Sequence, residues 1–326
     1  MSDDKENESG NGETPTWERK LVHELALSAL AEQRRARRWG IFFKFLAFAY
    51  LILLLVLWMP DELGLGTVKA PGEHTAVVEV QGVIAPGAKA SADLVIAGLR
   101  EAFEDKRTKG VIVRINSPGG SPVQAGYIHD EILRLRKKHQ EIPLHAVVTD
   151  ICASGGYYIA AAADKIYVDK ASVVGSIGVL MNGFGFVDAM ETLGIERRLL
   201  TAGEHKGIMD PFSPVEPQER AHLQTLIDNI HQQFIQVVRE GRGARLKGDP
   251  MIFSGLFWTG EESIELGLAD ALGSSSQVAR EVIGAEDLVD FTQEEDLLDR
   301  FAKRLGAGAA SALAEIGGLD ASPRLR

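Results

Sequence analysis

Cysteine is almost absent from this chain, whose 326 residues include Cys152 alone. A single cysteine excludes an internal disulfide and any metal site made of several thiolates, so the apolar core must hold the fold. Basic residues are also in deficit, since 35 Lys and Arg stand against 46 Asp and Glu. A nucleic-acid-binding protein needs a basic face to neutralise phosphates. The net charge of −11 therefore indicates no nucleic-acid partner.

Large apolar side chains are scarce before Trp17, and this segment is too polar to offset the entropy of ordering it, so we expect a disordered tail. From Trp17 onward leucine and valine recur at roughly helical spacing. The segment ends in four arginines: Arg34, Arg35, Arg37 and Arg38. Residues 1–40 are thus predicted to be a tail that ends in a basic amphipathic helix at a membrane surface.

Charge almost vanishes from Ile41 to Met59, where the sequence reads IFFKFLAFAYLILLLVLWM. About 20 helical residues, each rising about 1.5 Å, span a hydrocarbon core of roughly 30 Å, so this run predicts one transmembrane helix. Lys44 lies one turn from its start and can snorkel to the interface, while Trp39 and Trp58 lie where aromatic belts form. A buried core helix fits these flanks less well. A cleaved signal peptide would begin nearer Met1 and end in small residues.

The charges that flank this helix indicate its orientation. Arginines gather between Arg34 and Arg38 on one side, whereas Asp61 and Glu62 lie on the other. By the positive-inside rule the N-terminus is cytoplasmic, and the chain after Met59 lies outside the cytoplasm. We therefore expect a single-pass protein of the bacterial inner membrane with a periplasmic domain.

After a linker over residues 60–73, apolar runs alternate with helical patterns. Four runs predict short buried strands: 76–83, 110–115, 144–148 and 165–168. Four patterns predict helices: 92–104, 124–138, 155–163 and 217–241. Repeated strand-helix units indicate one α/β domain over 74–290 with its functional residues in loops. Residues 291–326 weaken into Gly, Ala and charge, which predicts a mobile tail.

Two glycine-rich turns directly follow predicted strands. The first, NSPGGSP, covers Asn116 to Pro122; Pro118 fixes one backbone angle, and the glycines adopt conformations closed to other residues. Its backbone N–H groups can therefore face a cavity and hold an oxyanion. An ordinary strand-to-helix turn explains the same residues equally well.

The second turn carries Ser154 and leads into the helical segment YYIAAAA. A serine there lies at the positive end of the helix dipole, and the amide of Gly155 points into the same space. An N-cap serine has the same position and is far commoner than a nucleophile, so this turn alone does not identify one. Cys152, two residues earlier, is more typical of a small buried apolar residue.

Five motifs favour a nucleophile over an N-cap at Ser154, because together they resemble the signal peptide peptidase A (protease IV) family. They are NSPGG, ASGGYYIA followed by AADKI, VVGSIGV, GEHKGIMDPF and WTGEESIELGLADALG, which match the family in order and approximate spacing over residues 76–273. The chain resembles the short members, which have one such domain behind one membrane anchor.

The resemblance implies roles for particular residues. Ser154 would be the nucleophile, Lys206 the general base and Ser176 the serine that holds this lysine, while the amides of Gly120 and Gly155 would form the oxyanion hole. It also implies a crotonase/Clp-like α/β spiral of repeated strand-strand-helix units and a homo-oligomer that encloses its sites. Signal-peptide remnants and other unfolded apolar peptides would be the substrates, bound extended by strand addition. No metal or organic cofactor is implied.

Lysine chemistry is consistent with these roles. An ordinary lysine has a pKa of about 10.4 and accepts a serine proton near neutral pH only where burial or positive neighbours lower that value. Glu204 must then point to solvent, because a carboxylate beside the amine would stabilise its charged form. A Ser-His-Asp site that uses His205 or His145 is an alternative. If the chain alternates sides locally, however, His205 and Lys206 cannot both face Ser154.

Two other functions fit the same fold. An acyl-CoA-binding crotonase-type enzyme could use the oxyanion site on a thioester, although coenzyme A belongs to the cytoplasm and the predicted domain does not. A non-catalytic membrane scaffold could also retain the fold. The presence of Ser154, Lys206 and Ser176 together disfavours this scaffold.

Overall fold

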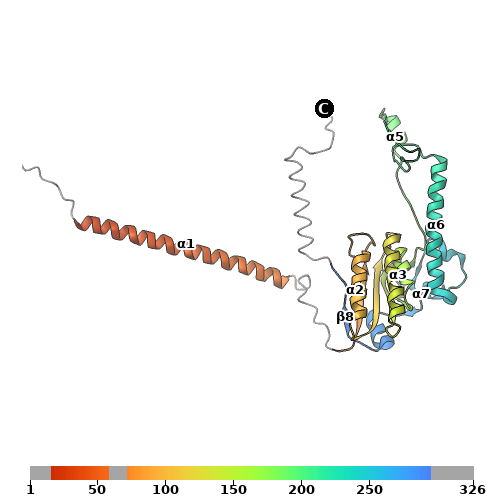
Figure 1. Cartoon of the computed structure of the whole chain (residues 1–326), viewed down its shortest axis with the longest axis horizontal. Helices are drawn as coiled ribbons and strands as arrows, with labels where there is room; N and C mark the ends of the chain where they lie inside the picture. Colours follow the sequence, from red (N-terminus) through yellow and green to blue (C-terminus); the bar gives the residue numbers. More distant parts are fainter. Residues whose placement is uncertain (1–15, 59–71, 295–326) are drawn as a thin grey trace, which may run out of the picture. The chain divides into compact units, whose positions relative to one another are not determined.

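The computed structural model describes residues 16–58 and 72–294 (Figure 1). The predicted N-terminal tail before Thr16, most of the linker and the tail from residue 295 lie outside these ranges. The chain divides into two units, residues 1–66 and 67–326. In the described part of the chain, the first unit holds one helix, and the second holds a sheet with the remaining helices.

Helix α1 (Thr16–Trp58) is one continuous helix of 43 residues. It joins the helical segments predicted over 17–38 and 41–59, because no proline within it removes a backbone hydrogen bond. Among the described residues, no helix has both the length and the apolar character needed to cross a membrane. The transmembrane helix predicted over 41–59 is not confirmed, and its last residue, Met59, lies outside the described ranges.

The second unit is built on a sheet whose described strands are mostly parallel. The strands are β1 (His74–Gln81), β2 (Thr108–Ser117), β3 (Leu144–Ala153), β4 (Lys165–Val168), β5 (Val173–Gly175), β6 (Phe257–Thr259), β7 (Ala271–Leu272) and β8 (Leu288–Asp290). Their order is β6-β5-β3-β2-β1-β8, with β4 paired to both β3 and β7. The pairing of β5 with β6 is antiparallel. The predicted α/β class is therefore confirmed.

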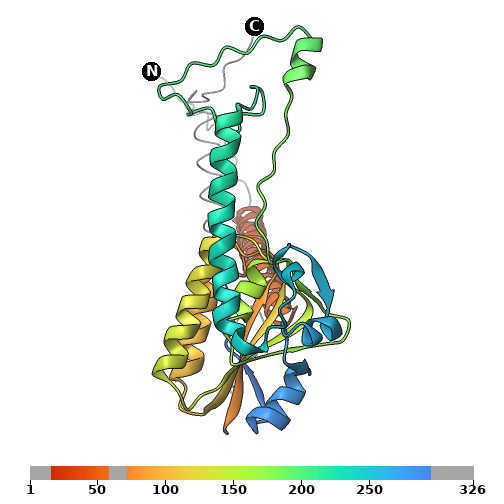
Figure 2. The ribbon, with the colours of Figure 1, turned by 90° about the vertical axis from the view of Figure 1, so that its right-hand side faces the viewer.

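Helices connect the strands and pack beside them (Figure 2). The α-helices are α2 (Ala92–Glu104), α3 (Pro122–Lys138), α4 (Gly155–Ala160), α5 (Val187–Thr192), α6 (Pro217–Arg242), α7 (Gly260–Glu265) and α8 (Ser275–Gln277). Shorter turns of helix are η1 (Gly243–Arg245), η2 (Pro250–Phe253) and the π-helical η3 (Val278–Ile283). The four predicted helices of this unit are all present as α2, α3, α4 and α6.

Successive side chains of the central strands point to opposite faces of the sheet, so the core has one cluster on each face. Val111 and Val113 of β2 belong to the main cluster, together with Leu99 of α2. Ile112, which lies between them, belongs to a second cluster with Val278 of η3. Because successive side chains of a strand point to opposite faces, both faces of β2 are covered. This explains why β2 has a continuous apolar run rather than an alternating one.

Residues 178–216, called the arm below, connect β5 to α6. Figures 1 and 2 both show α5 and the first turns of α6 standing away from the sheet. The other end of α6 is held on the domain, because Phe234 packs on Tyr158 of α4 with ring centroids 5.2 Å apart. Nearby, the buried Arg242 pairs with Asp270 at 2.8 Å. Several arm side chains are apolar and exposed, among them Leu180, Phe184, Leu193 and Leu200.

Candidate active site

Parallel pairing brings four strand ends to one edge of the sheet. Strands β1, β2, β3 and β5 lie side by side and run in the same direction, so their carboxyl ends and the turns after them lie together. Ligands of open α/β sheets bind outside such strand ends. Both glycine-rich turns predicted from the sequence lie at this edge, one after β2 and one after β3.

Ser154 lies between β3 and α4 in a strained backbone conformation. Its φ of 50° and ψ of −121° fall where non-glycine residues pay of order 1–3 kcal/mol. Its side chain caps no N–H of α4, and its hydroxyl bonds to no residue that the structure describes. The N-cap explanation of Ser154 is therefore wrong. A free serine hydroxyl on a strained strand-to-helix turn is typical of a nucleophile.

The backbone N–H groups of Gly120 and Gly155 lie near each other beside this serine. A Cβ placed on Gly155 would be 3.4 Å from the Gly120 nitrogen, so the two turns are in close contact. Neither N–H donates a hydrogen bond within residues 72–294. Both are therefore available to an anionic oxygen next to Ser154, which is the chemistry of an oxyanion hole.

Ile84 holds the first of these turns. Its N–H donates to the Gly119 carbonyl at 2.9 Å, and its carbonyl accepts from the Ser121 N–H at 2.8 Å. Gly120 lies between them with φ 150°, and a Cβ there would lie 2.2 Å from the Ile84 carbonyl oxygen. Nothing in the sequence points to Ile84, because its apolar side chain gives no sign that its backbone is the functional part.

Ser176 lies directly beside Ser154. The last residues of β3 and β5, Ala153 and Gly175, are partners in the parallel ladder. The Ser154 N–H donates to the Gly175 carbonyl at 2.9 Å, which extends this pairing to the serine. Ser176 follows with φ 53°. Within the described ranges, Met209 is the only other non-glycine residue with positive φ.

Lys206 lies in the arm and not beside Ser154 of the same chain. The lysine is exposed within a run of turns, and the preceding His205 contacts Glu219 in the first turn of α6 at 3.2 Å. Phe234, where α6 packs against α4, follows Glu219 by about 15 residues, or about 22 Å of helix. The structure therefore brings Ser154, Ser176 and the two amides together, but not Lys206.

Contacts within the arm close the loop that carries Lys206. Arg197 pairs with Asp210 at 3.0 Å, and its guanidinium carbon lies 5.4 Å from the centre of the Phe212 ring. Phe212 stacks on Phe186 with ring centroids 5.6 Å apart. These contacts join the two ends of the loop, so Lys206 projects from a closed segment rather than from a free chain.

This geometry weakens one of the two histidine alternatives, the one that uses His145. His145 lies near the start of β3, roughly 25–30 Å of extended strand away from its carboxyl end, so it does not reach Ser154 of the same chain. Burial lowers the pKa of the His145 imidazole. Residues 204–209 form turns rather than an extended strand. Strand alternation therefore does not separate His205 from Lys206, and the choice between them depends on the family resemblance.

Cys152 and Glu204 lie as the sequence predicted. Cys152 is fully buried in the main core cluster, and burial raises the pKa of its thiol, which makes a thiolate nucleophile unfavourable there. Glu204 is exposed to solvent.

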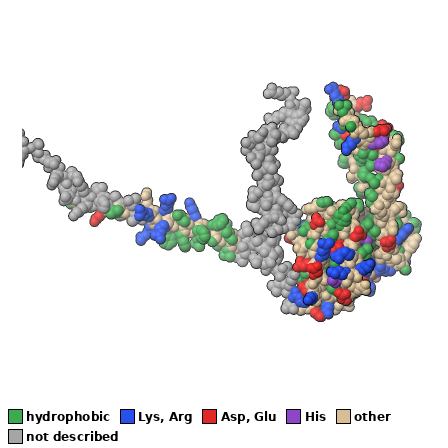
Figure 3. All heavy atoms as spheres, in the orientation of Figure 1, with side chains coloured by type: hydrophobic (Ala, Val, Ile, Leu, Met, Phe, Trp, Pro, Cys, Tyr) green, Lys and Arg blue, Asp and Glu red, His purple; other side chains and the backbone are tan. Residues whose placement is uncertain are grey.

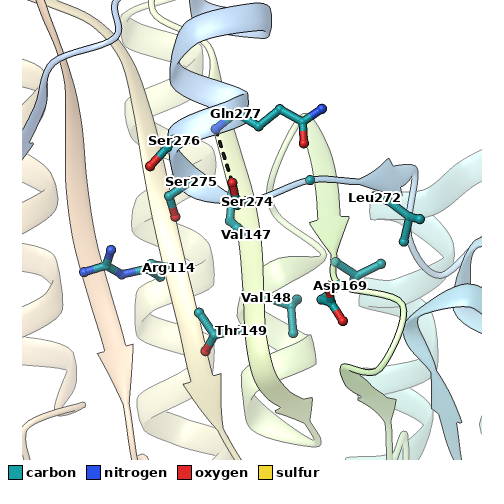
Figure 4. A pocket seen from close by; sticks show the side chains of 12 residues that line it. Arg114, Val147, Val148, Thr149, Asp169, Leu272, Ser274, Ser275, Ser276 and Gln277 are labelled. Carbon is teal, nitrogen blue, oxygen red and sulfur yellow. Dashed lines mark hydrogen bonds between the residues drawn. The ribbon is translucent and has the colours of Figure 1, made fainter.

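A separate pocket of about 510 Å³ lies between strands β2–β4 and residues 272–277 (Figure 4). Its polar lining includes Arg114, Thr149, Asp169 and the serines at 274–276. None of the predicted catalytic or oxyanion residues lines it.

In the part of the chain that the structure describes, no cluster of His, Cys, Asp or Glu side chains has the make-up of a metal site. The strand-end edge is therefore the candidate active site.

A strained serine with a free hydroxyl beside two free N–H groups is typical of hydrolases that act by acyl transfer. The model of Peptidase family S49 matches residues 136–288, a range that includes Ser154, Ser176 and Lys206. A putative protease of Synechocystis sp. is 33% identical over 199 residues, which are 61% of this chain and 69% of that protein. This chain belongs to peptidase family S49, which confirms the resemblance to signal peptide peptidase A.

Two further relatives match over smaller shares of their own length. A putative signal peptide peptidase SppA of Enterococcus faecium is 30% identical over 194 residues, which are 60% of this chain and 56% of that protein. A Na(+)/H(+) antiporter NhaA of Brucella abortus is 41% identical over 214 residues, which are 65% of this chain but 29% of the antiporter. The chain thus spans only part of these relatives, so their names do not describe it as a whole.

Gly119→Ala tests the close approach of the two turns. Gly119 has φ +97°, and a Cβ there would lie 2.7 Å from both the Gly155 nitrogen and the Ser154 Cβ. Displacement of these atoms by about 1 Å should lower peptide hydrolysis by about 100-fold. Gly126→Ala on α3 is the control, because nothing lies within 4 Å of its Cβ. Turnover of a fluorogenic apolar peptide checks both variants, and wild-type turnover by Gly119→Ala would contradict this geometry.

Proposed function

We propose that this chain is a serine endopeptidase in which Ser154 attacks the peptide carbonyl and forms an acyl-enzyme. The free hydroxyl of Ser154 beside the unpaired N–H groups of Gly120 and Gly155 is the observation that carries this proposal. Two such donors stabilise the negative oxygen that develops in the tetrahedral transition state. The amine product leaves first, and water then hydrolyses the ester to release the acid product.

Lys206 is the proposed general base, and Ser176 is the residue that orients it. A neutral lysine amine has two N–H donors and one lone pair, and the lone pair must point at the Ser154 hydroxyl to accept its proton. A second hydroxyl can accept from the amine without adding charge. The ladder between β3 and β5 supports this role, because it sets Ser176 next to Ser154.

The proposed base comes from a neighbouring protomer of a homo-oligomer. Within one chain, about 20 Å of α6 separates the neighbourhood of Lys206 from the body of the domain. The arm also exposes large apolar side chains that a second copy would cover, since Leu180 is 80% and Leu200 97% exposed. Association through the arms would bury this surface and carry each lysine toward the serine of the next protomer.

The finer fold we propose is the crotonase/Clp-like spiral of strand-strand-helix units. The branching of the sheet at β3 supports it. Residues 145–147 of β3 pair with β4, whereas residues 151–153 pair with β5. Strand β3 thus pairs with two different strands along its length. This is the arrangement expected of a spiral fold, in which the chain passes from one sheet layer into the next.

The proposed substrates are signal-peptide remnants and other unfolded apolar peptides. Such chains can add to a sheet edge as an extended strand, with main-chain hydrogen bonds supplying affinity. An oligomer that encloses its sites would admit them and exclude folded proteins. The names of two relatives, a putative signal peptide peptidase and a putative protease, support this choice over an acyl-CoA-binding enzyme or a scaffold.

Helix α1 is the proposed membrane attachment. Its side chains from Ile41 to Leu54 are exposed, and Lys44 is the one charged residue among them. Figure 3 shows basic side chains gathered on the part of α1 that precedes this apolar stretch. Such a basic segment favours the anionic cytoplasmic leaflet. Since the sequence stays apolar to Met59, we propose that the peptidase domain lies outside the cytoplasm of a bacterial inner membrane.

Protease accessibility tests this location. Protease added to intact spheroplasts should digest the peptidase domain and spare an epitope placed before Thr16, because the arginines at 34–38 favour the cytoplasmic side. Lysed spheroplasts, in which both parts are digested, serve as the control. A protected domain beside a digested epitope would reverse the topology, and release of the intact protein by salt alone would exclude apolar attachment.

Ser154→Ala and Lys206→Ala should each lower peptide hydrolysis by about 1000-fold or more, because groups that act as one unit fail together. His205→Ala should keep substantial activity, since the His205 ring contacts Glu219 of α6. Fluorogenic peptide turnover, with size-exclusion chromatography to confirm the oligomer, measures all three. An inactive His205→Ala beside an active Lys206→Ala would transfer the base role to histidine.

Mixing the two inactive variants tests whether the base crosses between protomers. If oligomers of Ser154→Ala and Lys206→Ala exchange subunits at a 1:1 ratio, about a quarter of the sites should combine an intact serine with an intact neighbouring lysine. Activity should then return to about that fraction of wild type. An unchanged absence of activity in oligomers shown to be mixed would place the dyad within one chain.

Ser176→Ala should lower turnover by about 10-fold to 1000-fold, the scale of a misoriented general base, with little change in thermal midpoint. Ser176→Asp should be less active, because a carboxylate stabilises the charged amine, and its remaining activity should require higher pH. The pH dependence of kcat for both variants checks this. Wild-type turnover by Ser176→Ala would show that another group orients the lysine.

A further inference from the structure

Ser117, the last residue of β2, is a fully buried serine beside the candidate oxyanion hole. Its hydroxyl donates to the Gly82 carbonyl at 2.6 Å. The same oxygen accepts a hydrogen bond from the Gly119 N–H at 3.1 Å. One side chain therefore joins the turn after β1 to the turn that carries Gly120.

These contacts restrict the peptide unit that leads into Gly120. The Gly82 N–H donates to the Asn116 carbonyl at 2.9 Å, so Gly82 is fixed to β2 through both its backbone groups. Gly119 is held through its N–H by Ser117 and through its carbonyl by Ile84. The Gly120 N–H belongs to the peptide unit of that same Gly119 carbonyl, so its direction is set by groups other than Gly120 itself.

Ser117 also touches the second turn. It is the ladder partner of Cys152 on β3. A Cβ placed on Gly156 would lie 3.1 Å from the Ser117 carbonyl oxygen and 3.4 Å from its Cβ. The residue thus packs directly under the start of α4, next to Gly155. The immediate neighbours of both proposed oxyanion donors, Gly119 and Gly156, therefore lie against this one buried serine.

We propose that Ser117 is a positioning residue for the oxyanion hole, acting through the turn that aims the Gly120 N–H. This inference rests on the proposed function, since it assigns the hydroxyl a part in transition-state binding. Without the hydroxyl, the buried Gly119 N–H and the part-buried Gly82 carbonyl would each lose this partner, so the turn would shift to satisfy them. Donors that act only on the developing oxyanion affect kcat more than substrate binding.

Ser117→Ala tests this role in the full-length protein. Its kcat should fall by about 10-fold to 100-fold, with KM changed by less than about 3-fold. Ser263→Ala is the matched control, because Ser263 is equally buried at 0% exposure and donates to the Gly260 carbonyl at the same 2.6 Å. It lies in α7, outside both turns, so its kcat should stay at the wild-type value even where its thermal midpoint falls.

A peptide aldehyde separates positioning from stability. The Ser154 hydroxyl adds to the aldehyde carbonyl and gives a hemiacetal whose oxygen occupies the oxyanion hole, so its Ki should rise in Ser117→Ala by the same factor as kcat/KM falls. Active sites are counted with a fluorophosphonate that labels Ser154. A purely structural role would lower that count but leave kcat per labelled site and the aldehyde Ki unchanged, and this outcome would overturn the inference.

Two further variants keep the outcomes distinct. Ser117→Cys retains the volume with a weaker donor and acceptor, so its kcat per site should lie between wild type and Ser117→Ala, and it serves if Ser117→Ala does not fold. A folded, fully active Ser117→Ala would reject the role of Ser117. If Ser117→Ala does not fold, a wild-type kcat per site and a wild-type aldehyde Ki in Ser117→Cys would reject it. Undiminished hydrolysis by Ser154→Ala would instead reject the proposed function itself.

Discussion

The hydrogen bond from the Ser154 N–H to the Gly175 carbonyl, 2.9 Å long, is the contact on which the candidate site depends. It extends the ladder of β3 and β5 by one residue and sets Ser154 beside Ser176. Both serines then take positive φ, a conformation that persists only where the surroundings impose it. Those surroundings are the parallel ladder and the core cluster that contains Cys152. The strain at the serines is therefore supported by the sheet rather than by a loop.

The sequence predicts the parts of this arrangement that depend on local pattern. Continuous apolar runs indicate β1, β2 and β4 because both sheet faces are covered. The pattern fails at the end of β3, which was predicted to stop at residue 148 but extends to Ala153. Polar Thr149 and Asp150 interrupt the apolar run, and the ladder with β5, whose residues lie more than 20 positions further on, is what continues the strand. A single-sequence pattern carries no information about such a partner.

The same limit applies to the serine itself. An N-cap serine and a strained nucleophile have identical local sequence, and what separates them is the φ of Ser154 and the absence of a cap hydrogen bond. Both follow from contacts with Gly175 and with the turn that Ile84 holds, far away along the chain. Only the ordered motifs identified Ser154 before the structure, because a family resemblance encodes long-range contacts that local propensity does not. Ile84 stayed hidden since its contribution comes from its backbone.

The proposed nucleophile and the proposed base are held in place by different kinds of interaction. Ser154 and its oxyanion donors are fixed by buried backbone hydrogen bonds, whereas Lys206 is carried by an arm whose ionic contacts, such as Arg197 with Asp210, are partly exposed. Exposed ion pairs contribute about 0–1 kcal/mol each, too little to hold a base at a reaction distance on their own. The contacts of the arm close the loop that carries Lys206 but do not bring this lysine to Ser154. The proposed base therefore reaches the serine only when the arm packs against another protomer. Under the proposed mechanism the nucleophile is therefore ready in each folded protomer, while the base is ready only after assembly, so peptide hydrolysis is confined to the oligomer.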